Sequence, residues 1–537
     1  MRAFLVISAL SAFFCQASAT ALDDYVWAPD EHYSYYDFGP DHIISGTNLF
    51  GNRSWTGYTL NMTSQKWLTD DDFSESSDSG SIWWHYLVVI VPDTVDWTRN
   101  ASMWVTGWSQ TSGFPQHNDE DIALAAALAM GSNIVIGCLF QIPNEHTTFS
   151  GDPIQKSRSE DAIIAYTWDH FLKDTSQPEW LLRFPMVKAT LRAMDTITDF
   201  TQKKYPEANY QFDYYTIAGA SKRGWTTWDV GVVDKERVMA ICPIVLDAIN
   251  FVDVEHHQWR SYGGWSWALN DYYEMNIMTR LDTPEMRMLQ EEVDPFFYAE
   301  RLTMPKLVVN AVLDEFQQPD DTDYWWDKMP EPKHFIMTPN AEHSEATGIF
   351  EIVPAIGTWL TYLLREQTVP EFTWTISNET GAITAVLDDE GDVYEASVFY
   401  AYSCGNNIDG KKRRDFRILS LDVPCECGIG YDGYCANVKS FWTREVLEPT
   451  ITADGKRSYT AHKEEPGDGR WVAYFIDIKY KEYGQTTTLQ DPPAWEACTH
   501  LPCDKPGRLE FTSQVSIWPN TFPYEDCSGE GCAGYLL

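Results

Sequence analysis

The stretch "YYTIAGASKRGWTTWDV" (residues 214–230) decides how the rest of the chain is interpreted. An aromatic and β-branched run, typical of a strand, leads into Gly219-Ala220-Ser221, and a segment that can form a helix follows directly. Small residues beside a serine suit a sharp turn in which the backbone is crowded. Ser221 is therefore a candidate nucleophile on a strand-to-helix turn. The alternative is an ordinary serine that caps the helix.

Strand-like and helix-like segments alternate around this turn, from about residue 84 to 365. The strand-like runs are 85–92, 101–108, 132–140, 212–220, 238–247, 305–314 and 333–339, and the helix-like ones include 119–131, 186–205 and 349–367. Several of the strand-like runs are apolar throughout, as in strands covered on both faces. This alternation predicts an α/β domain with a mostly parallel sheet.

Residues that could act together with Ser221 follow it along the chain, first an acid and then a histidine. In α/β-hydrolases the nucleophile stands in Gly-x-Ser-x-Gly and is followed along the chain by an acid and then a histidine. Here Arg223 occupies the second glycine position and Gly224 comes one residue later. Asp314 ends one strand-like run, and His343 follows the next. We predict an α/β-hydrolase fold with Ser221 as nucleophile, His343 as general base and Asp314 as the orienting acid.

Two other acids compete with Asp314 for this role. Asp247 ends the run 238–247, and Asp320 lies in "QQPDD", so both alternatives stay open. His334 lies at the wrong end of its strand to serve as the base.

An oxyanion site needs two backbone donors near the serine. The amide of Lys222 is the natural first donor, and the segment 105–110 offers Gly107 or Trp108 as the second. The side chains of Lys222 and Arg223 suggest that the site orients an acidic acyl group. The alternative for Arg223 is an ion pair with an Asp or Glu that holds the turn together.

An aromatic insert follows the run 238–247. Its large side chains either wall a substrate pocket or form the core of a helical cap; they are Trp259, Tyr262, Trp265 and Trp267. His256 and His257 are weak candidates for metal ligands, because neighbours on a strand point to opposite faces. We predict no metal and no other cofactor.

The pattern changes after Pro370 to short strand-like runs, 372–376, 382–389, 394–403 and 415–423, without a helical period. Eight of the 11 cysteines fall between residues 404 and 532, which predicts up to four disulfides. Cys425 and Cys427 are too closely spaced for a usual zinc pair. We predict a hydrolase domain at 22–368, with a cap insert around 250–300, and a β-rich, sandwich-like, cysteine-rich domain at 369–537.

Residues 1–21 resemble a removable secretion signal, with Arg2, an apolar stretch and small residues before the expected cleavage site. Glycan acceptor patterns begin at Asn52, Asn61, Asn100 and Asn378. The net charge is −40, which disfavours nucleic acids and anionic lipid surfaces as partners. We expect a secreted protein without a membrane span.

The run "GASKRGWTTW", together with "FPMVKATLRAMD", "PIVLDAINF" and the opening "LDDYVWAPDEHYSYY", resembles the PhoPQ-activated pathogenicity-related protein family. That family includes secreted autocrine proliferation repressor A-like proteins. The resemblance covers most of 22–368 and continues more loosely to 413–419. It implies an α/β-hydrolase fold with Ser221 at the turn and an extracellular signalling role.

Two functions therefore compete. The first is a secreted serine hydrolase that acts by acyl transfer on an ester or a peptide. The second is a secreted signalling protein, with a cell-surface receptor as partner, that keeps the scaffold while its catalysis is dispensable or absent.

Overall fold

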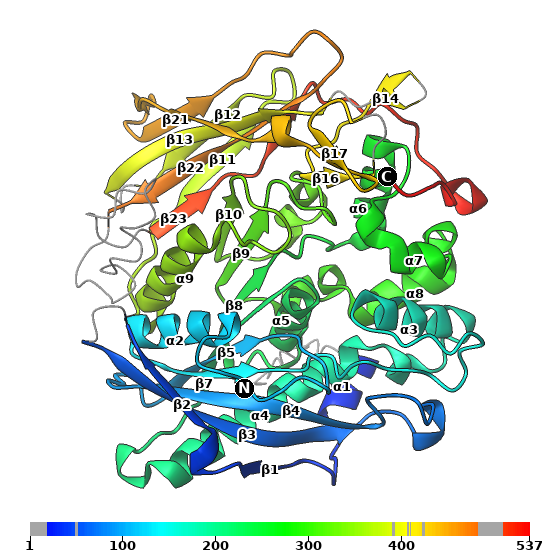
Figure 1. The fold of residues 1–537 in the computed structure, drawn as a ribbon. Coiled ribbons are helices and arrows are strands. Elements are labelled where there is room, and N and C mark those ends of the chain that lie inside the picture. Colours follow the sequence, from blue (N-terminus) through cyan, green and yellow to red (C-terminus); the bar gives the residue numbers. More distant parts are fainter. Residues whose placement is uncertain are drawn as a thin grey trace, which may run out of the picture.

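The strand that leads to Ser221 lies in the middle of a ten-stranded mixed sheet (Figure 1). The computed structural model describes residues 19–48, 52–388, 392–404, 407–408, 410–421, 425–481 and 509–537. The strands follow the order β1-β3-β4-β6-β5-β7-β8-β9-β10, and β2 pairs with β3. Their bounds are Ser34–Asp37 (β1), Ile43–Thr47 (β2), Ser54–Lys66 (β3), Ile82–Pro92 (β4), Asn100–Val105 (β5), Val135–Leu139 (β6), Tyr214–Ala220 (β7), Val238–Ile244 (β8), Lys306–Ala311 (β9) and Lys333–Thr338 (β10).

The half of this sheet from β6 to β10 is parallel, whereas β1 to β4 pair antiparallel. The parallel register aligns Gly219 with Val105 on one side and with Pro243 on the other. The carboxyl ends of the parallel strands therefore meet at one edge, where open α/β sheets place their sites.

Helices cover both faces of the sheet. Their bounds are Ala21–Trp27 (α1), Glu120–Ser132 (α2), Asp161–Lys173 (α3), Arg183–Lys204 (α4), Lys222–Val233 (α5), Phe251–Tyr262 (α6), Asn270–Glu274 (α7), Pro284–Val293 (α8) and Ile349–Leu364 (α9). Along β4, Leu87 and Val89 pack in the core that contains α4 and α5, and Val88 and Ile90 pack in the core that contains α2 and α9. This alternation gives the three layers of the predicted α/β-hydrolase fold.

Two larger antiparallel sheets lie in the C-terminal region, at the top of Figure 1, beside a small sheet of β14 and β15 and another of β16, β18 and β17. One of the larger sheets has the order β11-β12-β21-β20, and the other β19-β13-β22-β23 with β24 beside β22. Buried residues of β12, β13, β21 and β22 share one hydrophobic core, as in the predicted sandwich. The bounds are Phe372–Ile376 (β11), Ile383–Leu387 (β12), Val393–Tyr402 (β13), Asn407–Ile408 (β14), Lys411–Lys412 (β15), Leu419–Ser420 (β16), Ile429–Tyr431 (β17), Tyr434–Ala436 (β18), Thr443–Val446 (β19), Thr450–Ile451 (β20), Arg457–Ala461 (β21), Val472–Tyr480 (β22), Leu509–Thr512 (β23) and Ser516–Trp518 (β24).

Disulfides occur in this region, as the cysteine pattern predicts. They join Cys404 to Cys427, Cys425 to Cys435, and Cys527 to Cys532. Cys498 and Cys503 lie outside the described residues.

Two sequence-based boundaries differ from the structure. The run 415–423 is a strand only at Leu419–Ser420, because the segment before it crosses to the α/β part, where Arg414 and Arg417 are buried among polar partners. The hydrolase boundary at residue 22 falls inside helix α1, which begins at Ala21 and is capped by Thr20. Residues 1–18 of the expected signal lie outside the described residues. In the described part of the chain, no helix has the length and hydropathy to cross a bilayer.

Candidate active site

Ser221 is the single residue that separates strand β7 from helix α5. Its backbone has φ 57° and ψ −126°, outside the usual regions for a residue with a side chain. The Ser221 amide donates to the Ile244 carbonyl of β8 at 2.8 Å, and its own carbonyl accepts from the Trp225 amide at 3.0 Å. The turn is therefore fixed from both sides, and Ser221 holds the strained conformation found at nucleophile turns.

Two glycines make room for this turn. A Cβ added at Gly219 would lie 2.8 Å from the Arg223 carbonyl oxygen. A Cβ at Gly224 would lie 2.8 Å from the Ile244 carbonyl oxygen. The crowded position thus falls at Gly224, which explains why Arg223 is tolerated where the usual motif has its second glycine.

The three residues predicted as a triad form one hydrogen-bonded chain. The Nε2 atom of His343 lies 2.8 Å from the Oγ atom of Ser221, and its Nδ1 atom lies 2.7 Å from Oδ2 of Asp314. Asp314 is held in turn, because its Oδ1 atom accepts from the amides of Phe316 at 2.7 Å and Gln317 at 3.2 Å. A base that touches the nucleophile and is oriented by an acid is the arrangement that acyl transfer requires.

The other two acids bind elsewhere. Asp247 accepts from the indole of Trp325 at 2.5 Å, and Asp320 pairs with Arg414 of the C-terminal region. Asp314 is therefore the one of the three candidates that contacts His343.

The environment of His343 favours its protonated form. Burial disfavours the imidazolium, but the Asp314 carboxylate beside it more than offsets this, so the pKa of His343 lies above its ordinary value. An imidazole of this kind can hold the serine proton during an attack and return it to a leaving group.

The predicted oxyanion donors occupy the expected loops. The amide of Lys222 begins helix α5, where first-turn N–H groups have no partner within the helix. Gly107 and Trp108 follow β5, the strand next to β7, and Trp108 has φ 87°. A Cβ at Gly107 would lie 2.7 Å from a guanidinium nitrogen of Arg223, so this loop packs directly on the turn.

The cations after Ser221 are both engaged by acids at the start of helix α3. Arg223 forms a two-pronged pair with Glu160, and its Nε atom donates to the Ile142 carbonyl at 2.5 Å. The Nζ atom of Lys222 lies 2.8 Å from Glu160 and 3.0 Å from Asp161. These contacts match the alternative in which Arg223 holds the turn, rather than an acidic acyl group.

A cavity opens beside Ser221 and His343. Its wall is mainly apolar and aromatic, and it comes from helices α3 to α7 and the loops after β8 and β9. The lining residues include Ile164, Trp168, Trp225, Leu246, Phe251, Leu269, Tyr272, Met278, Leu281 and Phe316. Sequence reasoning missed this wall, because its residues come from separate segments and none has a recognisable spacing.

The four large side chains predicted from the insert lie elsewhere and fit the core alternative, whereas Phe251 and Tyr272 of the same insert line the cavity. None of the four lines the cavity. The indole of Trp265 donates to the Cys532 carbonyl at 2.8 Å, and that of Trp267 donates to the Leu419 carbonyl at 3.1 Å. They therefore attach the insert to the C-terminal region.

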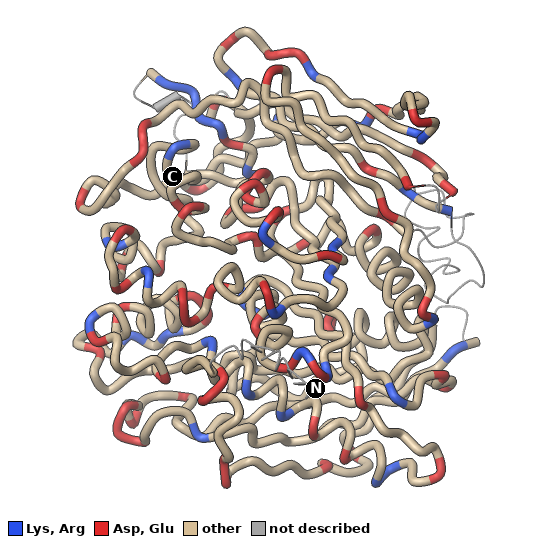
Figure 2. The backbone as a smooth tube through the Cα atoms, turned by 180° about the vertical axis from the view of Figure 1, so that it is seen from behind, with Lys and Arg blue, Asp and Glu red and all other residues tan. Residues whose placement is uncertain are grey.

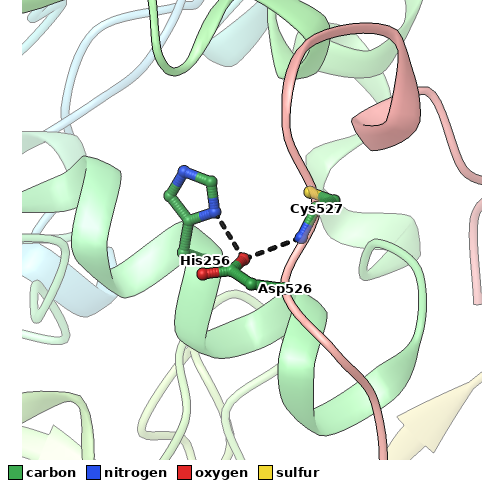
Figure 3. Close-up of side chains that lie close together, drawn as sticks. All are labelled: His256, Asp526 and Cys527. Carbon is green, nitrogen blue, oxygen red and sulfur yellow. Dashed lines mark hydrogen bonds and ion pairs between the residues drawn. The ribbon is translucent and has the colours of Figure 1, made fainter.

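His256 lies on helix α6 rather than on a strand, next to Asp526 and Cys527 (Figure 3). Its Nδ1 atom lies 2.7 Å from Asp526, and its Nε2 atom lies 3.0 Å from Asp282. The sulfur of Cys527 is bonded to Cys532. This group is therefore satisfied by its own hydrogen bonds and a disulfide, and we assign no metal to it.

The C-terminal region contacts the loops of two triad members. The Ile418 amide donates to the Leu313 carbonyl at 3.1 Å, one residue before Asp314. Asn340, three residues before His343, accepts from the Trp442 amide at 2.6 Å and donates to the Trp442 carbonyl at 3.1 Å. The loops that carry Asp314 and His343 are thus both in contact with the C-terminal region.

Comparisons with known proteins show which family and which proteins this chain resembles. The profile of the family described as PhoPQ-activated pathogenicity-related protein matches residues 22–417. The Autocrine proliferation repressor protein A of Dictyostelium discoideum is 35% identical over 99% of this chain and 97% of its own. Among solved structures, acetyl xylan esterase 1 from Thermoanaerobacterium sp. JW/SL YS485 is 12% identical with a TM-score of 0.40, over 65% of this chain and 94% of its own. Acetyl xylan esterase from Paenibacillus sp. R4 is also 12% identical, with a TM-score of 0.37 over 62% of this chain and 91% of its own.

Proposed function

The chain belongs to the PhoPQ-activated pathogenicity-related protein family, and from the geometry of its site we propose that it is a serine hydrolase that cleaves an ester by acyl transfer. One observation carries this proposal, the hydrogen-bonded chain from Ser221 through His343 to Asp314. The adjoining cavity supports it, because Ser221 and His343 both line a pocket large enough to hold part of a substrate.

The reaction would proceed in two halves. Ser221 Oγ attacks the ester carbonyl carbon while its proton passes to Nε2 of His343, and Asp314 stabilises the imidazolium. The amide of Lys222 and an amide of Gly107 or Trp108 stabilise the oxyanion. The C–O bond then breaks, and the leaving alkoxide takes the proton from His343. Water attacks the acyl-enzyme with His343 as base, which releases the acid and restores Ser221.

Labelling of the purified protein with a fluorophosphonate probe tests the proposal. We expect Ser221 to react, and Ser221→Ala and His343→Ala to lose most of the labelling, because triad members act as a unit. Ser176→Ala and His462→Ala serve as controls, since both residues lie at the surface away from the cavity. Absence of labelling in folded wild type would overturn the proposal, and so would labelling that survives in Ser221→Ala.

A peptide substrate is compatible with the same residues. Cleavage of an amide needs protonation of a poor leaving group, and His343 can supply that proton. Hydrolysis of matched ester and anilide substrates by the unlabelled wild-type protein would separate the two, and we expect the ester to be the better substrate.

The second candidate function is a secreted signal that acts through surface contacts and a cell-surface receptor. The name of the Dictyostelium relative favours it, because the similarity spans both chains almost completely. Treatment of responsive cells with wild type and with Ser221→Ala distinguishes the candidates. A growth response that survives in Ser221→Ala supports the signalling role, and a response that requires Ser221 ties any signalling to hydrolysis.

Secretion is part of both candidates. The disulfides of the C-terminal region support it, since such bonds persist in oxidising compartments. Expression with the native leader, followed by N-terminal sequencing of the protein recovered from the medium, tests both export and the cleavage site.

A further inference from the structure

The cavity beside Ser221 contains one charged side chain that stands apart from the others. Among the described residues, five Asp, Glu, Lys, Arg or His side chains line the cavity: Asp161, Arg183, Lys222, Glu255 and His343. His343 is held by Ser221 and Asp314, and Lys222 by Glu160 and Asp161. Glu255, in contrast, has no hydrogen-bond partner among the described residues for its Oε2 atom, which is shielded from solvent.

The remaining charges in the cavity do not compensate Glu255. Asp161 is bonded to Lys222 at 3.0 Å and accepts from the hydroxyl of Tyr272 at 2.9 Å. Arg183 donates to the Lys222 carbonyl at 2.5 Å and to Thr226 at 3.3 Å, and it lies over the ring of Trp225. Lys222 is thus ion-paired with other acids, Arg183 is held by a carbonyl, a hydroxyl and a ring, and neither forms an ion pair with Glu255. The carboxyl of Glu255 faces the cavity without a counter-ion.

The surroundings of Glu255 oppose its charge. Burial raises the pKa of this carboxyl to about 8, and the nearby carboxylate of Asp321 adds to the effect. A buried carboxyl without a partner is costly in either protonation state. Such a group is retained when a ligand supplies the missing partner, and the natural partner of a carboxylate is a cation.

Aromatic rings line the same cavity at close range. Trp168 lies 5.0 Å from Phe251 with the rings stacked, and 5.4 Å from Tyr272. Trp225 is 6.0 Å from Trp168 and 5.9 Å from Phe251. Clustered ring faces attract ammonium groups, and such groups of rings with a nearby acid are a common means of binding quaternary ammonium ions.

The charge of the whole molecule points the same way. A net charge of −40 attracts cations toward the protein and raises their local concentration. In Figure 2, acidic residues are spread throughout the part of the chain that the structure describes. An anionic substrate would be repelled both by the net negative charge of the protein and by the carboxylate of Glu255.

We propose that the substrate carries an ammonium group on the part that enters this cavity, with Glu255 as its counter-ion and the rings of Trp168, Phe251 and Tyr272 around it. This inference rests on the proposed function and specifies its substrate class. Ser221 then acts on a cationic ester, and Glu255 determines specificity without taking part in the bond changes.

Two pairs of esters, each matched in shape, test the proposal. In the first pair, butyrylcholine is compared with 3,3-dimethylbutyl butyrate, which replaces the charged nitrogen by carbon on the alcohol side. In the second, the 4-nitrophenyl esters of 4-(trimethylammonio)butanoate and 5,5-dimethylhexanoate make the same comparison on the acyl side. The measured quantity is the ratio of kcat/KM for the cationic and neutral members.

For at least one pair, we expect this ratio to fall about tenfold or more in Glu255→Gln, since the ion pair is lost. In wild type the ratio should rise between about pH 7 and about pH 9, as Glu255 ionises, and it should be flat in Glu255→Gln. Glu292→Gln is the matched control, because Glu292 also has an unpartnered Oε2 atom but does not line the cavity. Equal ratios in wild type and Glu255→Gln for both pairs would overturn the proposal.

A binding measurement separates failure of this inference from failure of the proposed function. Choline is titrated into Ser221→Ala, and binding is followed by tryptophan fluorescence. We expect saturable binding that weakens about tenfold or more when Glu255→Gln is added to this variant. Choline binding in a protein that hydrolyses no ester would support the cation site and reject the hydrolase. Absence of choline binding, together with hydrolysis of the neutral esters only, would do the reverse.

Discussion

The turn at Ser221 shows how single residues set the geometry of the site. Gly219 and Gly224 lie where the backbone of a neighbouring element leaves no room for a Cβ. The usual motif has its second glycine at the position of Arg223, and here that side chain is free to extend toward Glu160. The departure from the motif therefore brings an ion pair to the turn.

Gly224→Ala tests this account of the crowding. The new Cβ would lie 2.8 Å from the Ile244 carbonyl oxygen, and a backbone atom cannot move aside cheaply. We expect a loss of about 1–3 kcal/mol in the free energy of unfolding, although alanine is the better helix former. Urea denaturation measures it. Gly113→Ala is the control, since a Cβ there meets nothing within 4 Å. An unchanged or higher stability of Gly224→Ala would contradict the account.

The pH dependence of hydrolysis reports on His343. The base must be neutral to accept the serine proton, so activity is lost as pH falls through the pKa of His343. Asp314 holds that pKa above its ordinary value. In Asp314→Asn we expect this acidic limb of kcat/KM to move to lower pH, and kcat to fall about 10²–10⁴-fold.

The measurement is a pH–rate profile with a neutral ester. Asp327→Asn is the control, because Asp327 is exposed and lines a different cavity from the one beside Ser221 and His343. A limb that stays in place in Asp314→Asn would show that Asp314 does not set the pKa of His343.

At the scale of single residues, the sequence predicts the triad but not its setting. Serine, acid and histidine are found because each follows a recognisable strand and the order is fixed by the fold. The choice among Asp247, Asp314 and Asp320 depends on side-chain direction, which only the structure supplies. No sequence pattern around Glu255 marks it as a site residue, because its significance comes from the lack of a hydrogen-bond partner among the described residues.

Among the elements, the loop that leads to His343 depends on a contact with the C-terminal region. Asn340 bonds both the amide and the carbonyl of Trp442, and it has φ 59°. Glycine adopts this backbone conformation readily, so Asn340→Gly removes the two hydrogen bonds without forcing the turn to change.

We expect Asn340→Gly to fold and to lower kcat/KM for a neutral ester about tenfold, because a displaced base weakens the whole triad. Steady-state kinetics with thermal unfolding provides the measurement. Asn209→Gly is a suitable control, since Asn209 has φ 53° but lies after helix α4, away from the site. Unchanged kinetics in Asn340→Gly would show that the loop holds His343 without the C-terminal region.

The sequence predicts the elements unevenly, for a physical reason. All seven strand-like runs of the α/β part correspond to strands β4 to β10, because these strands are apolar and well bounded. Strand β3 is missed, because its buried residues include Ser64 and Gln65, whose polar side chains are buried through hydrogen bonds rather than hydropathy. The segment at Arg414 and Arg417 is misassigned since its burial rests on ion pairs.

For the molecule as a whole, the large negative net charge lowers the free energy of unfolding. With 79 acidic and 39 basic residues, the folded state brings like charges together. Raising NaCl from about 10 mM to about 100 mM shortens the screening length from about 30 Å to about 10 Å. We expect the melting temperature to rise, by about 1 °C for each kcal/mol of repulsion relieved in a chain of this length.

Scanning calorimetry measures this effect. Sodium sulfate at the same ionic strength is the control, because screening depends on ionic strength, whereas specific ion effects differ between the two salts. A melting temperature that does not change with salt would show that the acidic groups are already balanced locally.

The contacts between the C-terminal region and the triad loops also bear on how such proteins diversify. Ile418 and Trp442 bind the segments that carry Asp314 and His343, whereas the backbone of Ser221 is held by strand β8 and helix α5. A gene fusion or exchange that replaced the C-terminal region would keep Ser221 in place and remove contacts that hold Asp314 and His343. We therefore expect the two regions to be inherited together, with a change on one side of the contact matched by a change on the other.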